Sequence, residues 1–304
     1  MSQLGSKRSL LLVHAHPDDE SIFTGATMAK YAAEGARVVL VTCTMGERGG
    51  IRKGHPAEAA AAVVRLSRDT ESRLALMAKL RADELDAACA ELGVTEHWYL
   101  GGPGKWHDSG RRSAADSRMF CESDLDEATG DLVAVIREVQ PQAMVTYDAN
   151  GLYEHPDHIQ AHRVAWRAYQ TACDPTRVKF YALTIPRSVL AQATSHVPWE
   201  PGPDERVRQP PPGEQRRPSS HGFLRYGVTD EEVTTQIDAR TYLDAKLAAL
   251  RAHATQIVVN GSSFAVVGLI KMRALGIEYY RLLSGPSGTA TDSSGREDDL
   301  FCGL

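Results

Sequence analysis

The sequence has no apolar run long enough to cross a membrane, which takes about 18 consecutive apolar residues. Its first apolar run, from Leu10 to Val13, is too short even for the core of a signal peptide, although Lys7 and Arg8 precede it. There is also no excess of positive charge, since 34 basic side chains stand against 39 acidic ones. A nucleic-acid-binding protein needs a concentrated positive surface. We therefore expect neither a membrane nor a nucleic acid among the partners of this protein.

Cysteine is scarce, and aromatic residues make up only 7% of the sequence. The five cysteines are odd in number, widely spread and without a CxxC pair, so they form neither a disulfide framework nor a thiolate zinc site. This usage predicts a reduced, cytoplasmic protein. With 304 residues, of which 42% are hydrophobic, the chain is long enough for one large or two modest domains that fold without such links. Histidine is comparatively frequent, with eleven residues.

Short β-branched runs alternate with helical patterns along the first part of the chain. Strands are predicted at 9–13, 37–43, 96–100, 143–147 and 178–183, and helices at 21–34, 73–92, 125–139 and 156–173. Strands that are apolar on both faces and alternate with helices are typical of a parallel sheet covered on each side. We therefore predict an α/β fold with a Rossmann-like, doubly wound, mostly parallel sheet in the strand order 3-2-1-4-5.

Composition divides the chain into four parts. They are a Rossmann-like catalytic domain at 1–195, a Pro-rich loop or linker at 196–227, a small α+β C-terminal subdomain at 228–283 that completes the fold, and a tail at 284–304. The subdomain is predicted to contain a helix at 237–253 and strands at 264–267 and 278–283. The tail is rich in Ser, Gly, Thr and Asp, so we expect it to be disordered. The Pro-rich part is a candidate cover for the active site, and the alanine-rich piece 57–64 is predicted to be a surface helical insertion, with a substrate lid as the alternative.

The turn after the first strand lacks the glycines of a dinucleotide-binding loop, and no P-loop occurs elsewhere. Residues 14–20 read HAHPDDE instead, with two imidazoles and three carboxylates, which bind cations rather than phosphates. A second cluster, YDANGLYEHPDH, occupies residues 147–158 after the fourth strand. The first and fourth strands are neighbours in the predicted order. The two clusters are therefore expected to meet at the crevice between the carboxyl ends of these strands, where doubly wound sheets bind ligands.

Imidazole nitrogen and carboxylate oxygen are the ligands of a catalytic zinc ion, which uses three protein ligands and leaves one position to water. His16, Asp19 and His158 supply such a set. Fe²⁺ or another divalent metal accepts the same ligands, and the set holds one ion per subunit. Adjacent carboxylates in a turn point in different directions, so Asp18 is free to take a proton from a water whose pKa the metal lowers.

The elements AHPDDE and HPDH resemble those of the LmbE-like, or PIG-L, family of metal-dependent N-acetylglucosaminyl deacetylases. The resemblance covers about residues 9–283 and includes TCTMGERG, YLGGPGKWHDSG, YDANGLYEHPDH and GIEYY. It is closest to the branch that removes acetate from an N-acetylglucosaminyl-inositol in mycothiol biosynthesis. One departure is Glu154, where that branch has a glycine. The resemblance implies a small N-acetylated aminosugar conjugate as substrate, and the sequence leaves the oligomeric state open.

The resemblance implies the same zinc ligands and the same general base, Asp18, and it assigns five further residues. His155 would protonate the leaving amine or stabilise the oxyanion, and Asp157 would orient its ring. An acid for the amine needs a pKa near neutral, which histidine ordinarily has. Tyr153 would polarise the amide carbonyl. Arg81 would contact the inositol, and Asp108 would contact the sugar hydroxyls.

Alternatives remain within and outside this family. One is a mycothiol S-conjugate amidase or an antibiotic-tailoring deacetylase; residues 21–25, SIFTG, lack the lysine expected of the conjugate amidase, which weakly favours the acetamide. Another is a non-catalytic sugar- or metal-binding module, which would have no need of an acid–base pair. A serine hydrolase is disfavoured because GxSxG is absent, and a zincin because His158 and His162 lack the intervening glutamate. His14 is expected to support the ligands, and His162 to be structural.

Overall fold

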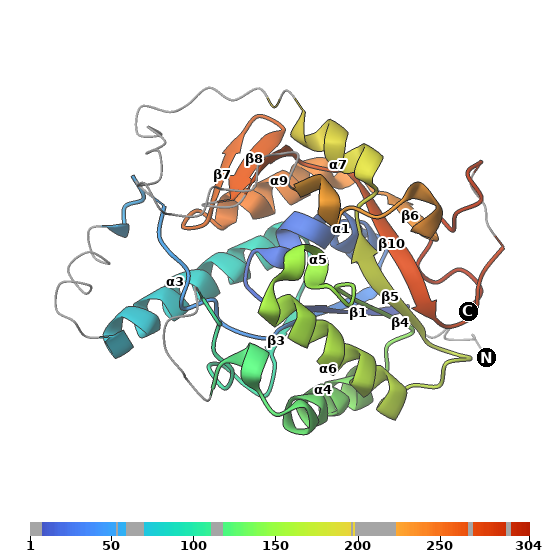
Figure 1. Ribbon diagram of the computed structural model, residues 1–304, viewed down its shortest axis with the longest axis horizontal. Helices are drawn as coiled ribbons and strands as arrows, with labels where there is room; N and C mark the ends of the chain where they lie inside the picture. The colour runs from blue at the N-terminus through green and yellow to red at the C-terminus, as the bar shows by residue number, and fades with distance from the viewer. Residues whose placement is uncertain are drawn as a thin grey trace.

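The computed structural model describes residues 8–52, 54–58, 70–110, 118–195, 197, 223–266, 270–289 and 293–304. Its centre is a seven-stranded sheet in the order β3-β2-β1-β4-β5-β10-β6 (Figure 1). These strands are β1 (Ser9–His14), β2 (Arg37–Thr42), β3 (Glu96–Tyr99), β4 (Ala143–Thr146), β5 (Lys179–Thr184), β6 (Thr235–Asp238) and β10 (Ile277–Ser284). Strands β1 to β5 run parallel, so the predicted order 3-2-1-4-5 and the mostly parallel α/β sheet are confirmed.

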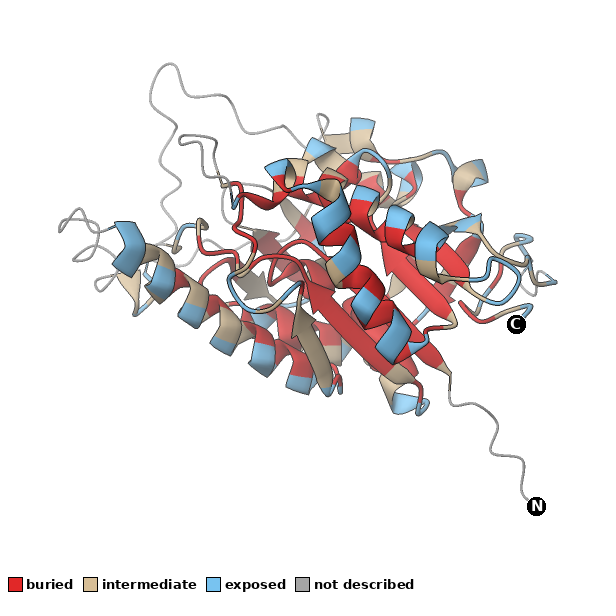
Figure 2. Cartoon of the chain, turned by 90° about the horizontal axis from the view of Figure 1, so that it is seen from below, coloured by how far each residue is buried: buried red, intermediate tan, exposed pale blue. Residues whose placement is uncertain are grey.

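Strands β1, β4 and β5 are buried along their whole length, as their largely apolar runs predict. Helices cover both faces of the sheet. On one face α4 (Leu125–Val139) packs on α6 (Pro156–Ala172), and on the other lie α1 (Gly25–Ala33), α3 (Thr70–Glu91) and α9 (Leu243–Ala252) (Figure 1). The helices turn their buried sides to the sheet and their exposed sides outwards (Figure 2). The core therefore lies on both sides of β1 and β4, and it fixes the loops that follow them.

The other helical elements are short. They are the π-helical turn η1 (Glu20–Thr24), α5 (Gly151–Glu154), α7 (Arg187–Thr194) and the 3₁₀ turns η2 (Phe120–Glu122), η3 (Leu224–Tyr226), η4 (Asp230–Glu232) and η5 (Arg240–Tyr242). Among the described residues, no helix combines the length and the apolar character needed to span a membrane.

The C-terminal segment departs from the predicted subdomain in two ways. Strand β10 lies antiparallel between β5 and β6, so the strand expected at 278–283 belongs to the main sheet. The helix expected from residue 237 begins only at Leu243, because β6 pairs with β10 in front of it. What remains separate is a three-stranded sheet of β7 (Ile257–Asn260), β8 (Ser263–Val266) and β9 (Lys271–Arg273). It packs on α7 and α9 around its own apolar cluster.

The tail at 284–304 is not disordered where the structure describes it, and that prediction is wrong. Leu300 is fully buried, and Phe301 packs its ring on Tyr31 at 5.4 Å between centroids. Glu297 accepts hydrogen bonds from the fully buried Lys179 Nζ at 2.9 Å. Together with the hydrogen bonds that Asp299 accepts from Arg8 and Tyr31, these contacts hold a segment whose average composition is polar.

Two predictions fall mainly outside the described residues. The alanine-rich insertion at 57–64 is described only at residues 57 and 58, and the Pro-rich segment at 196–227 only at residue 197 and from residue 223 onwards. The end of the Pro-rich segment reaches the site, because the Phe223 ring lies 5.9 Å from that of Tyr153 between centroids.

Candidate active site

The candidate site lies where the loops after β1 and β4 meet. The two strands are hydrogen-bonded neighbours, and Thr146 Oγ1 donates to the carbonyl of Val13 at 2.9 Å. Directly beyond the strand ends, the backbone N–H of Ala15 donates to the Tyr147 hydroxyl at 2.8 Å. The two clusters predicted from the sequence therefore come together at the crevice between neighbouring strand ends, as a doubly wound sheet requires.

Of the three predicted metal ligands, the two histidines converge on a carboxylate oxygen of the third, Asp19. Asp19 Oδ2 lies 3.2 Å from His16 Nδ1 and 3.4 Å from His158 Nε2. His158 is fully buried, and neither of its ring nitrogens makes a hydrogen bond with the described part of the chain. A buried imidazole without a hydrogen bond is costly unless something else occupies its nitrogens. The residues present therefore fit a metal ion.

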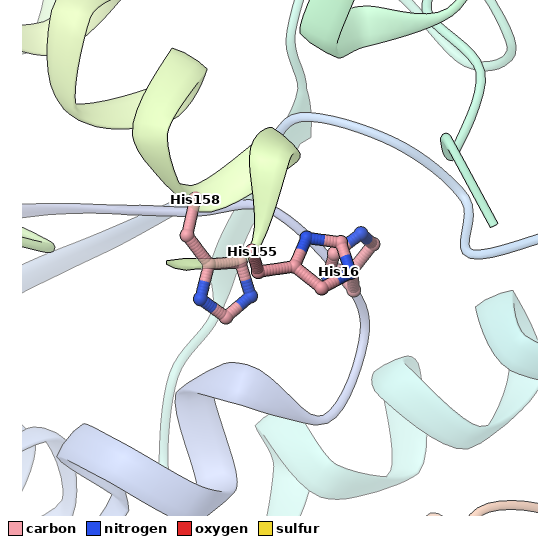
Figure 3. Close-up of side chains that lie close together, drawn as sticks. All are labelled: His16, His155 and His158. Atoms are coloured by element: carbon pink, nitrogen blue, oxygen red, sulfur yellow. The ribbon is translucent and has the colours of Figure 1, made fainter. Parts of the chain in front are cut away.

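The third imidazole of the crevice is that of His155. The ligand atoms of His16, His155 and His158 lie within 4.8 Å of one another, and Figure 3 shows the three rings gathered at the start of α6. Gly151 permits this packing, since a Cβ there would lie 2.8 Å from the Cβ of His158. Its φ of +62° is also one that glycine adopts without strain.

Asp157 does not orient the ring of His155 through its carboxylate, as the resemblance had implied. Asp157 Oδ2 accepts a hydrogen bond from His16 Nε2 at 3.0 Å and another from the backbone N–H of Ser109 at 2.9 Å. A carboxylate that holds one ring nitrogen of a metal-binding histidine fixes the ring and directs the other nitrogen to the metal. In this geometry Asp157 directs His16 Nδ1 towards Asp19.

His155 is instead oriented by the backbone at the start of α6. It is the N-cap of that helix, and its Nδ1 accepts the N–H of Asp157 at 3.2 Å, with Pro156 as the first helical residue. A nitrogen that accepts a hydrogen bond carries no proton, so this ring is neutral and bears its hydrogen on Nε2. Burial, together with the neighbouring His16 and His158, lowers the pKa of His155 to about 3, not to the near-neutral value expected from the sequence.

Asp18 has the most unusual backbone of the site. Its φ is +114°, which is unfavourable for any residue except glycine and persists only where the surroundings impose it. Burial raises the pKa of Asp18 to about 7, although the positive charge of Arg81 opposes the shift. A carboxyl group with a pKa near 7 both takes up and releases protons at neutral pH, which suits a general base.

Arg81 lies beside Asp18 and is buried rather than a surface charge. Its Nη2 donates to Asp18 Oδ2 at 2.9 Å and also to the carbonyl of Pro17, and its Nη1 donates to the carbonyl of Gly46 at 3.0 Å. Nε makes no hydrogen bond among the described residues. The guanidinium of Arg81, on helix α3, thus holds the carboxylate of Asp18 in one orientation.

Tyr153 and its neighbours form a strained turn beside the histidines. Leu152 and Glu154 on either side of Tyr153 both have positive φ, +61° and +64°. Glu154 stands where the resemblance predicts glycine, and this left-handed backbone explains that preference. Its exposed carboxylate lies 3.5 Å from Arg225 Nη2, and the buried Tyr153 hydroxyl has a raised pKa because of burial and the charge of Asp19.

Asp108 closes the other side of the crevice. Its Oδ1 accepts the N–H of Gly110 at 2.8 Å and lies 3.5 Å from His16 Nε2, and its backbone N–H donates to Glu47 Oε1 at 2.8 Å. Burial raises the pKa of Asp108, but His16 outweighs this and the net shift is downwards. Together with Asp19 and Asp157, Asp108 makes the crevice strongly negative, which favours a cation.

The comparison with known families agrees with this geometry. The model of the PIG-L family, described as GlcNAc-PI de-N-acetylase, matches residues 11–169. The chain belongs to the PIG-L family. The matched PIG-L segment runs from β1 to α6 and contains all nine of the predicted catalytic, metal-binding and substrate-binding residues. It ends before β10, β6 and the small sheet, which lie in the C-terminal part of the chain.

Relatives within the PIG-L family match along almost the whole chain. A protein of Thermomonospora curvata named 1D-myo-inositol 2-acetamido-2-deoxy-alpha-D-glucopyranoside deacetylase is 50% identical over 98% of this chain and 97% of its own length. A protein of the same name from Thermobispora bispora is 46% identical over 98% of this chain and 99% of its own length. Among solved structures, the 4-carboxy-2-hydroxymuconate hydratase GalB from Pseudomonas putida covers 94% of this chain with a TM-score of 0.50 and 19% identity. That likeness concerns the fold alone.

Tyr147 is the main residue of the PIG-L crevice that the sequence did not single out for a role. Its hydroxyl donates to Asp19 Oδ2 at 2.7 Å, and its ring stacks on that of His158 with 4.0 Å between centroids. It therefore touches two of the three predicted metal ligands. Its place directly after β4 was the available signal. His14 and His162 take the supporting places expected of them: His14 Nε2 lies 2.9 Å from Thr24 Oγ1, and His162 Nδ1 donates to the Tyr147 carbonyl at 2.8 Å.

Proposed function

We propose that this chain is a zinc-dependent deacetylase of mycothiol biosynthesis. Its substrate would be 1-O-(2-acetamido-2-deoxy-glucopyranosyl)-myo-inositol, from which it releases acetate and the free amine. The observation that carries the proposal is the buried His158 ring, whose nitrogens have no hydrogen-bond partner among the described residues and lie beside Asp19. The names of the two relatives, at 50% and 46% identity over nearly the full chain, support the substrate.

Zinc would be held by His16 Nδ1, Asp19 Oδ2 and His158 Nε2. When bound there, it would lower the pKa of a water and polarise the acetamide carbonyl. The protein supplies the orientation of this set. Asp157 holds the far nitrogen of His16, and the Tyr147 hydroxyl holds Asp19.

The proton transfers would be carried by Asp18. Arg81 occupies its Oδ2, so we assign proton uptake from the attacking water to Oδ1. Amide nitrogen leaves only after protonation, and Asp18 would return the same proton to it. Tyr153 and the neutral His155 would donate their O–H and Nε2–H to the oxyanion that develops on the carbonyl oxygen.

Two further residues are proposed to contact the sugar conjugate. Asp108 would accept hydrogen bonds from sugar hydroxyls, since Oδ1 is held by Gly110 while the carboxylate lines the crevice. Arg81 would reach the inositol only through the Nε–H or the second Nη1–H, because the other three N–H groups of its guanidinium donate to Pro17, Gly46 and Asp18. Of these two contacts, the geometry supports that of Asp108 better.

The test is acetate and free-amine release from the N-acetylglucosaminyl-inositol, measured in parallel with turnover of a mycothiol S-conjugate. We expect the first substrate to be turned over faster, with activity lost on chelation and regained on addition of Zn²⁺. The variant Asp18→Asn should lower kcat about 100- to 10,000-fold while metal content stays unchanged. Faster turnover of the conjugate would contradict the proposed substrate. Full activity of metal-loaded Asp18→Asn would contradict the assignment of Asp18 as the general base.

A further inference from the structure

Two buried titratable side chains next to the crevice have no part in the proposed reaction. Glu20 and His253 are both fully buried, and His253 Nε2 lies 2.7 Å from Glu20 Oε1. Glu20 opens η1, directly after the metal-binding turn, whereas His253 caps the C-terminal end of α9. His253 lies beyond residue 169, where the match to the PIG-L model ends. The pair therefore joins the C-terminal segment to the active-site loop.

The second oxygen of Glu20 reaches Asp18. Glu20 Oε2 accepts the backbone N–H of Asp18 at 2.9 Å, and Oε1 also accepts the hydroxyl of Ser21 at 2.5 Å. The residue held in this way is the one with a φ of +114°. Such a backbone costs on the order of 1–3 kcal/mol and persists only when several contacts impose it. The hydrogen bond that Asp18 donates to Glu20 fixes its backbone N–H, and the one that it accepts from Arg81 fixes its carboxylate.

The hold on Asp18 depends on where the carboxylate of Glu20 lies, and His253 fixes that position because its Nε2 lies 2.7 Å from Glu20 Oε1. Without His253, Oε1 would keep only the hydroxyl of Ser21 as a partner among the described residues, and the carboxylate would be free to turn Oε2 away from the N–H of Asp18.

We propose that His253 is a positioning residue for catalysis: through Glu20 it holds the strained backbone of Asp18, and so aims the general base into the crevice. The inference rests on the proposed function, because it takes Asp18 as the base. The C-terminal segment, which contains His253, would thereby contribute to catalysis by positioning Asp18. A substrate-binding defect is not expected, because His253 lies behind the loop and not in the crevice.

The structure offers a matched control on the same helix. Lys246 of α9 is also buried and pairs with a buried carboxylate, Glu278, at 2.6 Å. Glu278 likewise accepts backbone N–H groups of the N-terminal region, those of Ala26 at 3.1 Å and Thr27 at 2.8 Å. These groups belong to α1 and not to the catalytic turn. If both pairs only hold α9 against the sheet, substitution of His253 and of Lys246 should change kcat equally. The proposal predicts a change in kcat for His253 alone.

The experiment compares His253→Asn, whose amide cannot reach Glu20, with His253→Gln, whose amide nitrogen can occupy the place of Nε2. We expect His253→Asn to lower kcat about 10- to 100-fold, with KM and metal content unchanged, because displacement of a catalytic group by about 1 Å costs up to about 100-fold. His253→Gln should recover most of kcat. Lys246→Met should lower the melting temperature and leave kcat of the folded protein within about two-fold of the wild type, since its partner Glu278 holds α1 and not the catalytic turn.

A double-variant comparison tests whether His253 acts through Asp18. In the Asp18→Asn background, His253→Asn should cause no further loss of kcat, because the group that it positions is already disabled. Independent, multiplying losses would overturn the proposal, as would an equal kcat loss in Lys246→Met or a change confined to KM. If His253→Asn does not fold, His253→Leu carries the same comparison. An inactive wild type contradicts the proposed function, whereas an active wild type that is insensitive to His253 contradicts this inference alone.

Discussion

Two buried polar clusters of the same sheet differ in how completely their hydrogen bonds are made. The metal crevice, formed by His16, Asp19, Asp157 and His158, leaves both nitrogens of His158 and Oδ1 of Asp157 without a partner among the described residues. The tail anchor, formed by Lys179, Tyr181, Thr235 and Glu297, has a hydrogen bond on every one of its side chains. Both clusters are buried, so burial alone does not separate them.

The difference indicates which cluster serves function and which serves stability. In the tail anchor, Glu297 receives hydrogen bonds from Lys179, Tyr181 and Thr235, at 2.9 to 3.1 Å. A fully connected network of this kind stabilises one structure. In the metal crevice, polar atoms are held close together and left unsatisfied, which costs stability unless a ligand binds there. Each cluster therefore predicts its own response to substitution.

The largest effect is expected from His158→Leu. Neither imidazole nitrogen makes a hydrogen bond within the described residues, and leucine can keep an apolar contact with the Tyr147 ring, so the melting temperature of the metal-free protein should stay equal or rise. Metal binding and activity should fall below detection, because one of the three proposed ligands is gone. Calorimetry of the metal-free protein, metal analysis and an acetate-release assay measure the three quantities. A marked loss of stability in the metal-free variant would contradict the interpretation that the ring nitrogens of His158 contribute no hydrogen bond to the fold.

The opposite pattern is expected from Lys179→Met in the tail anchor. Removing the ammonium leaves the carboxylate of Glu297 buried without its counter-charge, which costs about 3–5 kcal/mol in the free energy of unfolding. Urea denaturation measures this loss, and kcat/KM of the folded fraction should match the wild type. The double variant Lys179→Met/Glu297→Gln is the control, since it removes both charges and should recover part of the stability. A drop in kcat/KM would show that the two clusters are coupled.

The sequence was informative about the metal crevice and uninformative about the tail anchor, for a physical reason. Strand periodicity is local, and the position of ligands at the carboxyl ends of neighbouring strands follows from the topology alone. The pair Lys179–Glu297 joins residues 118 apart, and β10 inserts between β5 and β6 by antiparallel pairing that no local pattern encodes. A tail of polar composition therefore looked disordered although Leu300 is fully buried.

Within the crevice, the sequence did not predict the directions in which the side chains point. Asp157 and His155 were both singled out from the HPDH motif, but which of them touches which partner depends on the first turn of α6. There His155 becomes the N-cap and Asp157 turns towards His16. The positive φ of Asp18 could not be predicted either, because the presence of an aspartate does not indicate such a backbone angle. Residue type and spacing locate such a site, whereas cap geometry and backbone strain decide the contacts.

A smaller effect, on metal affinity, is expected from a substitution of Asp157 in the metal crevice. Asp157→Asn keeps the shape of the side chain and removes the charge that holds His16 Nε2 at 3.0 Å. Metal affinity should fall about 10- to 100-fold, as is typical when the partner of a metal-binding histidine is altered. Competition with a chelating dye measures this, and Asp126→Asn on the exposed start of α4 is the control. Unchanged affinity would mean that Asp157 does not orient His16.

The smallest effect concerns the pH dependence of the tail anchor. Burial alone would raise the pKa of Glu297, but the hydrogen bonds from Lys179 and Gly288 lower it in the folded protein. A lowered folded pKa adds stability above the unfolded value, about 4.3, and this stability is lost as the pH falls through the folded pKa. The gap in unfolding free energy between the wild type and Glu297→Gln should therefore be widest at neutral pH and narrow towards pH 3. Urea titrations at several pH values measure it, and a gap that stays constant would mean that Glu297 has the same pKa in both states.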